Sequence, residues 1–232
     1  MIISHSHRFI LIKSLKTAGT SLETALSNHC SGSDVVVPIN DFGHNRDAGS
    51  QLVHRSMNAD EFYRQIGQHV DAPTIKAREP AEVWNSYFKF SIARNPWDRA
   101  LSYFFWDHRR DASLTPPKRL YHRLGVPYDD FTPIKQKFTE FIRSRTLENN
   151  DRFYIIDDEL CVDFVIRYER LEDDYRAVCE RIGLSTLEIP QLKTGFRAKG
   201  RPYTDYYDDE TRDIVADLHR NDIRLFDYRF GA

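Results

Sequence analysis

The chain has 232 residues, of which 41% are hydrophobic and 13% aromatic, enough to bury a sizeable core in a single domain. Its formal net charge of −2 argues against a nucleic-acid-binding protein, and no stretch has the roughly 20 apolar residues of a membrane span or the form of a signal peptide. The scattered cysteines Cys30, Cys161 and Cys179 indicate reduced thiols rather than a disulfide framework or metal site, so we expect a cytoplasmic protein.

The first informative segment, residues 9–23, reads FILIKSLKTAGTSLE. An apolar strand over 9–12 ends in a short loop with two lysines, and a helical pattern follows. Backbone N–H groups at the start of a helix, together with the helix dipole, bind anions, so this arrangement predicts a phosphate site. Thr20 and Glu23 have the spacing of a capping box, which supports a helix start here.

This loop differs from the nucleotide-binding loop G-x-x-x-x-G-K-[ST], because Lys16 comes three residues before the segment's only glycine. Gly19 allows a close approach of the backbone, Thr20 and Ser21 supply hydroxyls, and Lys16 supplies a positive charge. Lys13 is interpreted as an ordinary lysine at the strand end. From this segment alone, a phosphate site and an ordinary polar turn remain alternatives.

A second segment of the same kind, residues 86–106, reads SYFKFSIARNPWDRALSYFFW. Residues 87–93 are aromatic and β-branched and predict a strand, while Asn95 and Pro96 suit the cap and first turn of a helix. Arg94 stands at the strand end and Ser102 two turns into the helix, so the two can converge on one anion. A guanidinium offers phosphate a forked set of donors.

The rest of the chain alternates short apolar strands with helices. We expect strands at 35–37, 153–156 and 164–166, and helices from 58 or 60 to 65, over 134–144, over 171–182 with Gly183 as its end, and over 208–226. Residues 40–58 and 107–133 are interpreted as surface loops. This order predicts an α/β fold with a central parallel sheet, helices on both faces, and ligands bound outside the carboxyl ends of the strands.

Together the two segments resemble the sulfotransferases that use 3′-phosphoadenosine 5′-phosphosulfate (PAPS), and the similarity runs over about residues 8–230. In that family K-x-x-G-[ST]-[ST] holds the 5′-phosphosulfate, and R-[ND]-P with a serine eight residues after the arginine holds the 3′-phosphate. The first motif is matched by Lys16, Gly19, Thr20 and Ser21, and the second by Arg94, Asn95, Pro96 and Ser102. Leu22, where the cytosolic branch has tryptophan, and the RNPWDR wording make the chain more similar to the carbohydrate (Golgi-type and bacterial) branch.

The resemblance implies one sulfotransferase domain, residues 1–232, with a P-loop-like three-layer fold and acceptor-side loops near 40–58 and 107–133. It implies sulfuryl transfer from PAPS to an acceptor hydroxyl of a saccharide, giving PAP and a sulfate ester without a metal. Lys16 would stabilise charge on the leaving oxygen. His54, in VHRSMNADEF, is similar to the histidine base of that branch, with His44 behind it and a carboxylate, Glu79 or Glu82, as a further alternative.

The resemblance also implies a set of nucleotide contacts. The first loop would hold the phosphosulfate, and Arg94 with Ser102 would hold the 3′-phosphate. Tyr168, just past the strand at 164–166, would contact the adenine. A late loop, FRAKGRPY, would return basic residues to the 3′-phosphate. The predicted nucleotide ligands are Lys16, Thr17, Ala18, Gly19, Thr20, Ser21, Arg94, Ser102, Tyr168, Arg197, Lys199, Gly200 and Arg201.

Other residues are interpreted without a part in the donor site. Arg99, Arg109 and Arg110 are candidates for a basic rim that meets an anionic acceptor, with a solvated face as the alternative. The remaining histidines that we considered, His5, His7, His108, His122 and His219, are interpreted as solvated or terminal surface residues.

Two other functions stay open at this point. One is a phosphoryl transferase, disfavoured because the nucleotide-binding wording and a metal-binding aspartate are missing. The other is a catalytically silent module that binds PAP or another nucleotide. The acceptor (a lipid-linked saccharide or a small-molecule alcohol also fits), the choice of O- or N-sulfation and the oligomeric state are not specified by the sequence.

Overall fold

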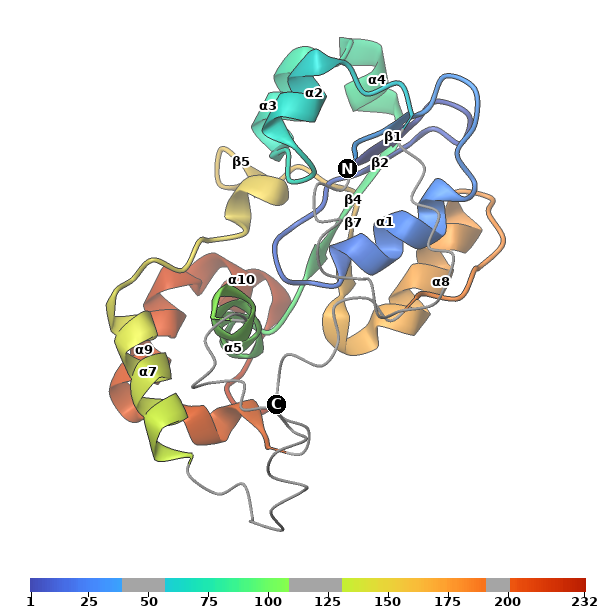
Figure 1. Cartoon of the computed structure of the whole chain (residues 1–232). Helices are drawn as coiled ribbons and strands as arrows, with labels where there is room; N and C mark the ends of the chain where they lie inside the picture. Colours follow the sequence, from blue (N-terminus) through green and yellow to red (C-terminus); the bar gives the residue numbers. More distant parts are fainter. Residues whose placement is uncertain (39–56, 109–130, 191–200) are drawn as a thin grey trace. The chain divides into compact units, whose positions relative to one another are not determined.

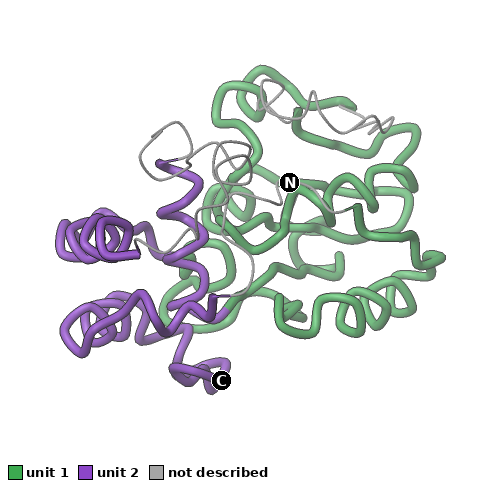
Figure 2. The backbone as a smooth tube through the Cα atoms, turned by 60° about the horizontal axis from the view of Figure 1, so that its bottom comes forward, with its two compact units in different colours: residues 1–94, 150–192 green, residues 95–149, 193–232 purple. Residues whose placement is uncertain are grey.

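The computed structural model describes residues 1–38, 57–108, 131–190 and 201–232 (Figure 1). The chain divides into two compact units, one made of residues 1–94 and 150–192 and the other of residues 95–149 and 193–232 (Figure 2). The first unit holds the sheet, and the described part of the second is helical.

The five-stranded sheet of the first unit has the order β3-β1-β2-β4-β7. Strands β2, β4 and β7 are parallel, whereas β1 runs antiparallel to both of its neighbours. The fold is therefore α/β with a central sheet that is mainly parallel, and the antiparallel strand β1 was not predicted from the sequence. A short turn joins β1 to β2, and a connection of that length permits only an antiparallel pair. The strands are β1 (Ile2–Ser4), β2 (Phe9–Leu11), β3 (Val35–Val36), β4 (Phe88–Ala93) and β7 (Phe164–Arg167).

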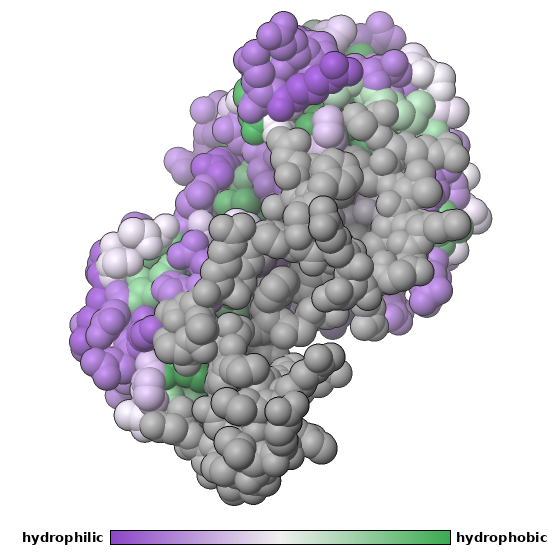
Figure 3. Space-filling view, in the orientation of Figure 1, coloured by the Kyte–Doolittle hydropathy of each residue, from purple (hydrophilic) through white to green (hydrophobic). Residues whose placement is uncertain are grey.

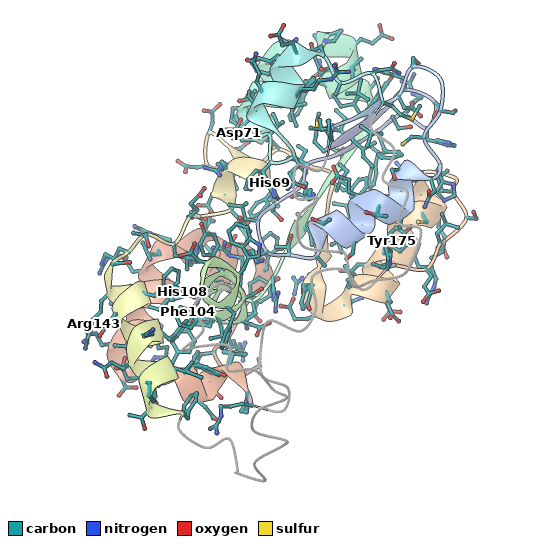
Figure 4. All side chains as sticks on the ribbon, in the orientation of Figure 1. His69, Asp71, Phe104, His108, Arg143 and Tyr175 are labelled. Atoms are coloured by element: carbon teal, nitrogen blue, oxygen red, sulfur yellow. The ribbon has the colours of Figure 1, made fainter. Side chains whose placement is uncertain are left out.

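Two helices cover one hydrophobic core of this sheet. Helix α1 (Gly19–Ser27) contributes Leu22 and Leu26, and α8 (Leu171–Arg181) contributes Tyr175 and Val178, to a cluster that includes Phe90 of β4. The two helices lie side by side in Figure 1, and Figure 4 labels Tyr175 where α1 and α8 lie next to each other. The core therefore holds α1 and the carboxyl ends of the parallel strands together.

Short elements complete the first unit. Asp60 caps α2 and Asp71 caps α3, and each side chain accepts a bond from a backbone N–H three residues on. The α2 helix was predicted; α3 and α4 were not, although Asp71 and Pro73 are cap signals. The surface over these helices is mostly hydrophilic (Figure 3). The elements are α2 (Glu61–Ile66), α3 (Ala72–Arg78), α4 (Ala81–Ser86), η1 (Asp151–Phe153), β5 (Ile155–Ile156), β6 (Glu159–Leu160) and η2 (Tyr168–Arg170).

Aromatic side chains form the core of the second unit. Asn95 caps α5 as predicted, accepting from the Trp97 N–H at 3.2 Å. Phe104 packs edge-on against Phe138 at 5.4 Å, and His108 lies over Phe104 at 4.6 Å (Figure 4). The elements are α5 (Pro96–Asp107), α7 (Thr132–Arg143), η3 (Tyr203–Tyr206), α9 (Asp209–Leu218) and α10 (Arg220–Phe226). No helix in the described part of the chain is long and apolar enough to cross a membrane.

Three sequence predictions about the second unit are wrong. The single helix expected over 208–226 is two helices that meet at His219. His219 and Arg99 are both fully buried rather than solvated or on a basic rim. Arg99 donates to the Glu148 carbonyl at 2.9 Å, and its Nη2 lies 3.1 Å from His219 Nε2. Burial and then the Arg99 charge lower the pKa of His219 to about 2, so this histidine is neutral.

Candidate anion-binding site

The loop that joins β2 to α1, residues 12–18, has a strained backbone. Lys16 and Ala18 both adopt the left-handed conformation, with φ of 61° and 65°. For residues with a β-carbon this costs roughly 1–2 kcal/mol each. Such strain clusters at functional sites, and turns of this type direct successive N–H groups into an anion-binding concavity.

Helix α1 begins at the predicted place but without the predicted cap. Ala18 is the N-cap and makes no side-chain cap bond, and the first helical bonds run from the N–H groups of Ser21 and Leu22 to the Ala18 carbonyl at 2.9 and 3.2 Å. The capping box of Thr20 and Glu23 is wrong, because the Glu23 carboxylate is buried against Lys13. The N–H groups at the very start of α1 thus keep the orientation that suits an anion.

Below the loop lies a buried ion pair, Lys13 with Glu23. Their side chains are 1% and 0% exposed, the ammonium is 2.6 Å from the carboxylate, and it also donates to Gln68. Burial alone would raise the pKa of Glu23, but the Lys13 charge and the contacting Met1 amine outweigh it and lower the pKa to about 2. The interpretation of Lys13 as an ordinary strand-end lysine is therefore wrong: it is a fixed internal charge.

Gly19 is needed because Lys13 passes directly beneath it. A β-carbon at Gly19 would lie 2.7 Å from Lys13 Cγ, and Ile92 closes the other side at 3.5 Å. The glycine conformation itself is helical, so close packing and not backbone freedom requires this residue. The glycine of the motif thus connects the anion loop to the buried ion pair.

Several side chains hold the loop backbone. Ser91 of β4 donates to the Ile12 carbonyl at 2.7 Å, and Ser14 donates to the Ile92 carbonyl. Thr17 is fully buried and lies 2.7 Å from the Ser14 hydroxyl. The Thr17 side chain is therefore committed to the loop's own structure, and its predicted part in ligand binding would fall to its backbone.

Arg94 meets this loop at the end of β4. Its Nη1 donates to the Lys16 carbonyl at 3.1 Å, and its guanidinium lies 3.9 Å from the centre of the Tyr168 ring. The parallel pairing of β4 and β7 brings their carboxyl ends, and hence Arg94 and Tyr168, together. Three residues predicted from separate segments, Lys16, Arg94 and Tyr168, thus form one cluster, in which the aromatic face supports the guanidinium.

His69 is a further residue at this site, which the sequence analysis overlooked. It precedes α3, lies beside the loop after β2 (Figure 4), and its Nδ1 is 3.0 Å from the Lys13 carbonyl. A carbonyl only accepts, so Nδ1 carries the proton and Nε2 is the basic nitrogen. Burial and then the Lys13 charge lower the pKa of His69 to about 3, so it is neutral at ordinary pH. The available signal was its place between the two motifs, next to the Asp71 cap.

The remaining predicted site residues lie at other positions in the fold or outside the residues that the structure describes. Thr20 is half-buried and Ser21 buried in α1, and Ser102 is half-buried on α5 of the second unit. Arg201 lies 3.5 Å from Asp205 and stacks on Phe131 at 4.1 Å. Glu79 accepts from the Tyr63 hydroxyl, and Glu82 is exposed on α4. Outside the described residues are His44, His54, Arg109, Arg110, His122, Arg197, Lys199 and Gly200, with most of both expected acceptor loops.

The comparisons with known proteins give one match. A family model described as "Sulfotransferase family" matches residues 1–229, which include both motifs and residues of both units. No curated protein and no solved structure gives a significant match. Within residues 1–38, 57–108, 131–190 and 201–232, no group of three or more His, Cys, Asp or Glu side chains is placed to hold a metal ion.

Proposed function

The chain belongs to the sulfotransferase family, and from that premise we propose that it transfers a sulfuryl group from PAPS to an acceptor hydroxyl on a saccharide. The products are PAP and a sulfate ester. The observation that carries the proposal is the cluster at the carboxyl ends of β2, β4 and β7: a strained loop with Lys16, the Arg94 guanidinium bonded to that loop, and Tyr168 stacked on the guanidinium. Ligands of open α/β sheets bind at such strand ends.

The donor nucleotide would be held by both motifs in a P-loop-like three-layer fold. The backbone of residues 16–21 and the start of α1 suit the 5′-phosphosulfate. Arg94 supplies the permanent charge for the 3′-phosphate, and Tyr168 offers a face for adenine. The proposal also retains Ser102 and Arg201, and the predicted nucleotide ligands Arg197, Lys199 and Gly200 outside the described residues.

The reaction requires little more than placement and electrostatics. The bond from sulfur to the bridging oxygen breaks, a bond from sulfur to the acceptor oxygen forms, and the acceptor proton goes to a base. Charge builds on the phosphate oxygen that leaves. Lys16 would stabilise that charge in the transition state, where a preplaced donor has most effect.

Two histidines are candidates for the base. His54 is suggested by sequence resemblance, whereas His69 lies beside the loop with its Nε2 unprotonated and its ring oriented by the Lys13 carbonyl. The low pKa of His69 reflects burial and the neighbouring Lys13 cation. A bound phosphosulfate brings negative charge nearby, which raises a histidine pKa towards the range useful for proton transfer. We therefore favour His69, with His54 as the alternative.

Binding of PAP tests the donor site. We expect PAP to bind in calorimetry without magnesium and more tightly than ATP, and an Arg94→Ala variant to lose roughly a hundredfold in affinity with its charge-assisted bonds. Arg176→Ala, which removes an exposed arginine of α8 paired with Asp173, is the matched control and should bind PAP like the wild type. Wild-type protein that ignores PAP, or prefers magnesium–ATP, would reject the proposal in favour of phosphoryl transfer.

Cleavage of PAPS distinguishes the enzyme from a silent nucleotide-binding module. With PAP binding intact, loss of PAPS cleavage in His69→Gln but not in His54→Gln would assign the base to His69, and the reverse pattern to His54. Wild-type protein that binds PAP but never cleaves PAPS in the presence of saccharide alcohols would support the silent module.

A further inference from the structure

A buried asparagine holds the residue before Lys16 by both of its backbone groups. Asn150 is 1% exposed, its Oδ1 accepts from the Leu15 N–H at 3.2 Å, and its Nδ2 donates to the Leu15 carbonyl at 3.1 Å. The side-chain amide of asparagine has both an acceptor and a donor, so it can bond the N–H and the carbonyl of one residue at the same time. Asn150 comes from a part of the chain 135 positions away, so this contact belongs to the tertiary structure.

The contact lies next to Lys16, one of the two left-handed residues of the loop. Leu15 is followed by the left-handed Lys16, whose own carbonyl accepts from Arg94. Asn150 therefore fixes the peptide groups before the strained residue, and Arg94 fixes the group after it. A left-handed residue with a side chain persists only where its surroundings determine the backbone on both sides.

We propose that Asn150 is a positioning residue for Lys16. By holding the N–H and the carbonyl of Leu15, it keeps Lys16 left-handed and so sets the direction in which the ammonium meets the bound anion. This inference rests on the proposed function for the identity of that anion, the phosphosulfate. The clamp itself is independent of any ligand.

Asn149 provides a matched control one residue away. It is also an asparagine that donates to a backbone carbonyl, that of Leu218 at 3.0 Å, but this bond lies within the second unit and not at the loop. An Asn149→Ala variant removes the same chemical group. Asn150→Ala removes the clamp, and Asn150→Asp keeps its shape while placing a carboxylate where the amide donated to Leu15.

Hydrogen exchange of the Leu15 amide, read at single-residue level in the ligand-free protein, tests the clamp. We expect the exchange rate of this amide to rise at least about tenfold in both Asn150 variants and to stay unchanged in Asn149→Ala. Asn150→Ala removes the acceptor of the Leu15 N–H, and Asn150→Asp replaces the donor to the Leu15 carbonyl with an oxygen that repels that carbonyl. Equal rates in the wild type and both Asn150 variants would overturn the inference without bearing on the proposed function.

A double-mutant cycle with PAP as the probe tests the link to Lys16. We expect Lys16→Ala and Asn150→Ala each to weaken PAP binding roughly tenfold, and the double variant to weaken it no more than about twentyfold, since residues that act through one another are not additive. A loss of roughly a hundredfold in the double variant would show independent effects and overturn the inference.

The outcomes separate the two proposals. Wild-type protein that does not bind PAP rejects the proposed function, while exchange at Leu15 still decides whether Asn150 clamps the loop. Wild-type protein that binds PAP, with Asn150→Ala and Asn149→Ala behaving alike, supports the donor site and rejects the positioning role. PAPS cleavage in a single turnover gives a second readout, in which Asn150→Asp should be slower than Asn149→Ala by roughly 10- to 100-fold.

Discussion

Four basic residues from two short segments fall into two different environments. Lys16 and Arg94 lie together at the anion loop, each only partly buried, whereas Lys13 and Arg99 are 1% and 0% exposed. Lys13 is neutralised by Glu23, and Arg99 donates to a backbone carbonyl and faces a neutral histidine. In each segment one cation lies at the loop, and another, three or five positions away, is buried inside the fold.

This difference shows that a basic motif mixes residues with separate tasks. Lys16 and Arg94 lie at the anion loop and are only partly buried, whereas Lys13 and Arg99 lie in the protein interior, where they bond to other groups of the protein. Substitutions of the first pair should therefore affect ligand binding and turnover, and substitutions of the second pair should affect the free energy of unfolding. The following experiments test that division, from the largest expected effect to the smallest.

Glu23→Gln should give the largest loss of stability. It leaves the Lys13 ammonium buried without its carboxylate, and breaking a buried ion pair from one side costs about 3–5 kcal/mol. Urea unfolding at pH 7 measures the loss, with Glu172→Gln on the exposed side of α8 as the control. A change as small as that of the control would mean that Lys13 does not depend on this pair.

Lys16→Ala should affect turnover and leave stability almost unchanged. Removal of one preplaced donor at a developing anion lowers kcat by roughly 10²–10³, whereas the unfolding free energy should move by less than about 0.5 kcal/mol. PAPS cleavage and urea unfolding of the same preparation check both, with Lys76→Ala on α3 as a control for loss of an exposed lysine. Unchanged PAPS cleavage would remove Lys16 from the mechanism.

The same substitution, arginine to lysine, should have opposite effects at Arg94 and at Arg99. Arg94→Lys loses the forked donor set and the stack on Tyr168, so PAP affinity should fall about tenfold with little change in stability. Arg99→Lys should leave PAP affinity unchanged and lower the unfolding free energy by about 1–3 kcal/mol through its unmade buried bonds. Calorimetry with PAP and urea unfolding of both variants measure the two effects. The opposite pattern would contradict the assignment of Arg94 to ligand binding and of Arg99 to stability.

The buried His219 should make the free energy of unfolding depend on pH. Burial and then the Arg99 charge lower its pKa in the folded state from the ordinary 6.5 to about 2. Below pH 6.5 the folded state therefore binds fewer protons than the unfolded state, so this contribution to stability is present above pH 6.5 and lost as pH falls towards 2. Between pH 6 and pH 4 this histidine should lower the free energy of unfolding by as much as about 1.4 kcal/mol for each unit that the pH falls. Urea unfolding of His219→Gln at several pH values should show a correspondingly shallower slope than the wild type, and parallel slopes would contradict the assignment.

The local chemistry of the site was predictable where the signal lies in neighbouring residues. The strand before Lys16, the start of α1 near Gly19, and the Asn95 cap of α5 follow from apolar periodicity and from cap and turn residues close in sequence. The sequence also predicted parallel strands with ligands at their carboxyl ends, and the structure brings Arg94 and Tyr168 together at this edge. Each of these depends on contacts within a few residues or on the general geometry of a parallel sheet.

Predictions failed where long-range burial changed the meaning of a residue. Thr20 and Glu23 have capping-box spacing, yet Glu23 turns to Lys13 because an ion pair beneath the loop satisfies both charges. His219 stands in a charged stretch, yet the fold buries it beside Arg99. His69 was overlooked because its ring is held beside the loop by the Lys13 carbonyl, a group 56 positions away in the sequence.

The sequence by itself determined the two strand–loop–helix segments, the residue types they offer to an anion, and membership of the sulfotransferase family. Only the tertiary structure decided which cations remain at the loop and which are buried, that Gly19 is required by the Lys13 side chain beneath it, and that Asn150 holds Leu15. The reason is physical: periodicity and capping act over one or two turns, whereas burial and pairing of polar groups depend on residues that only folding brings together.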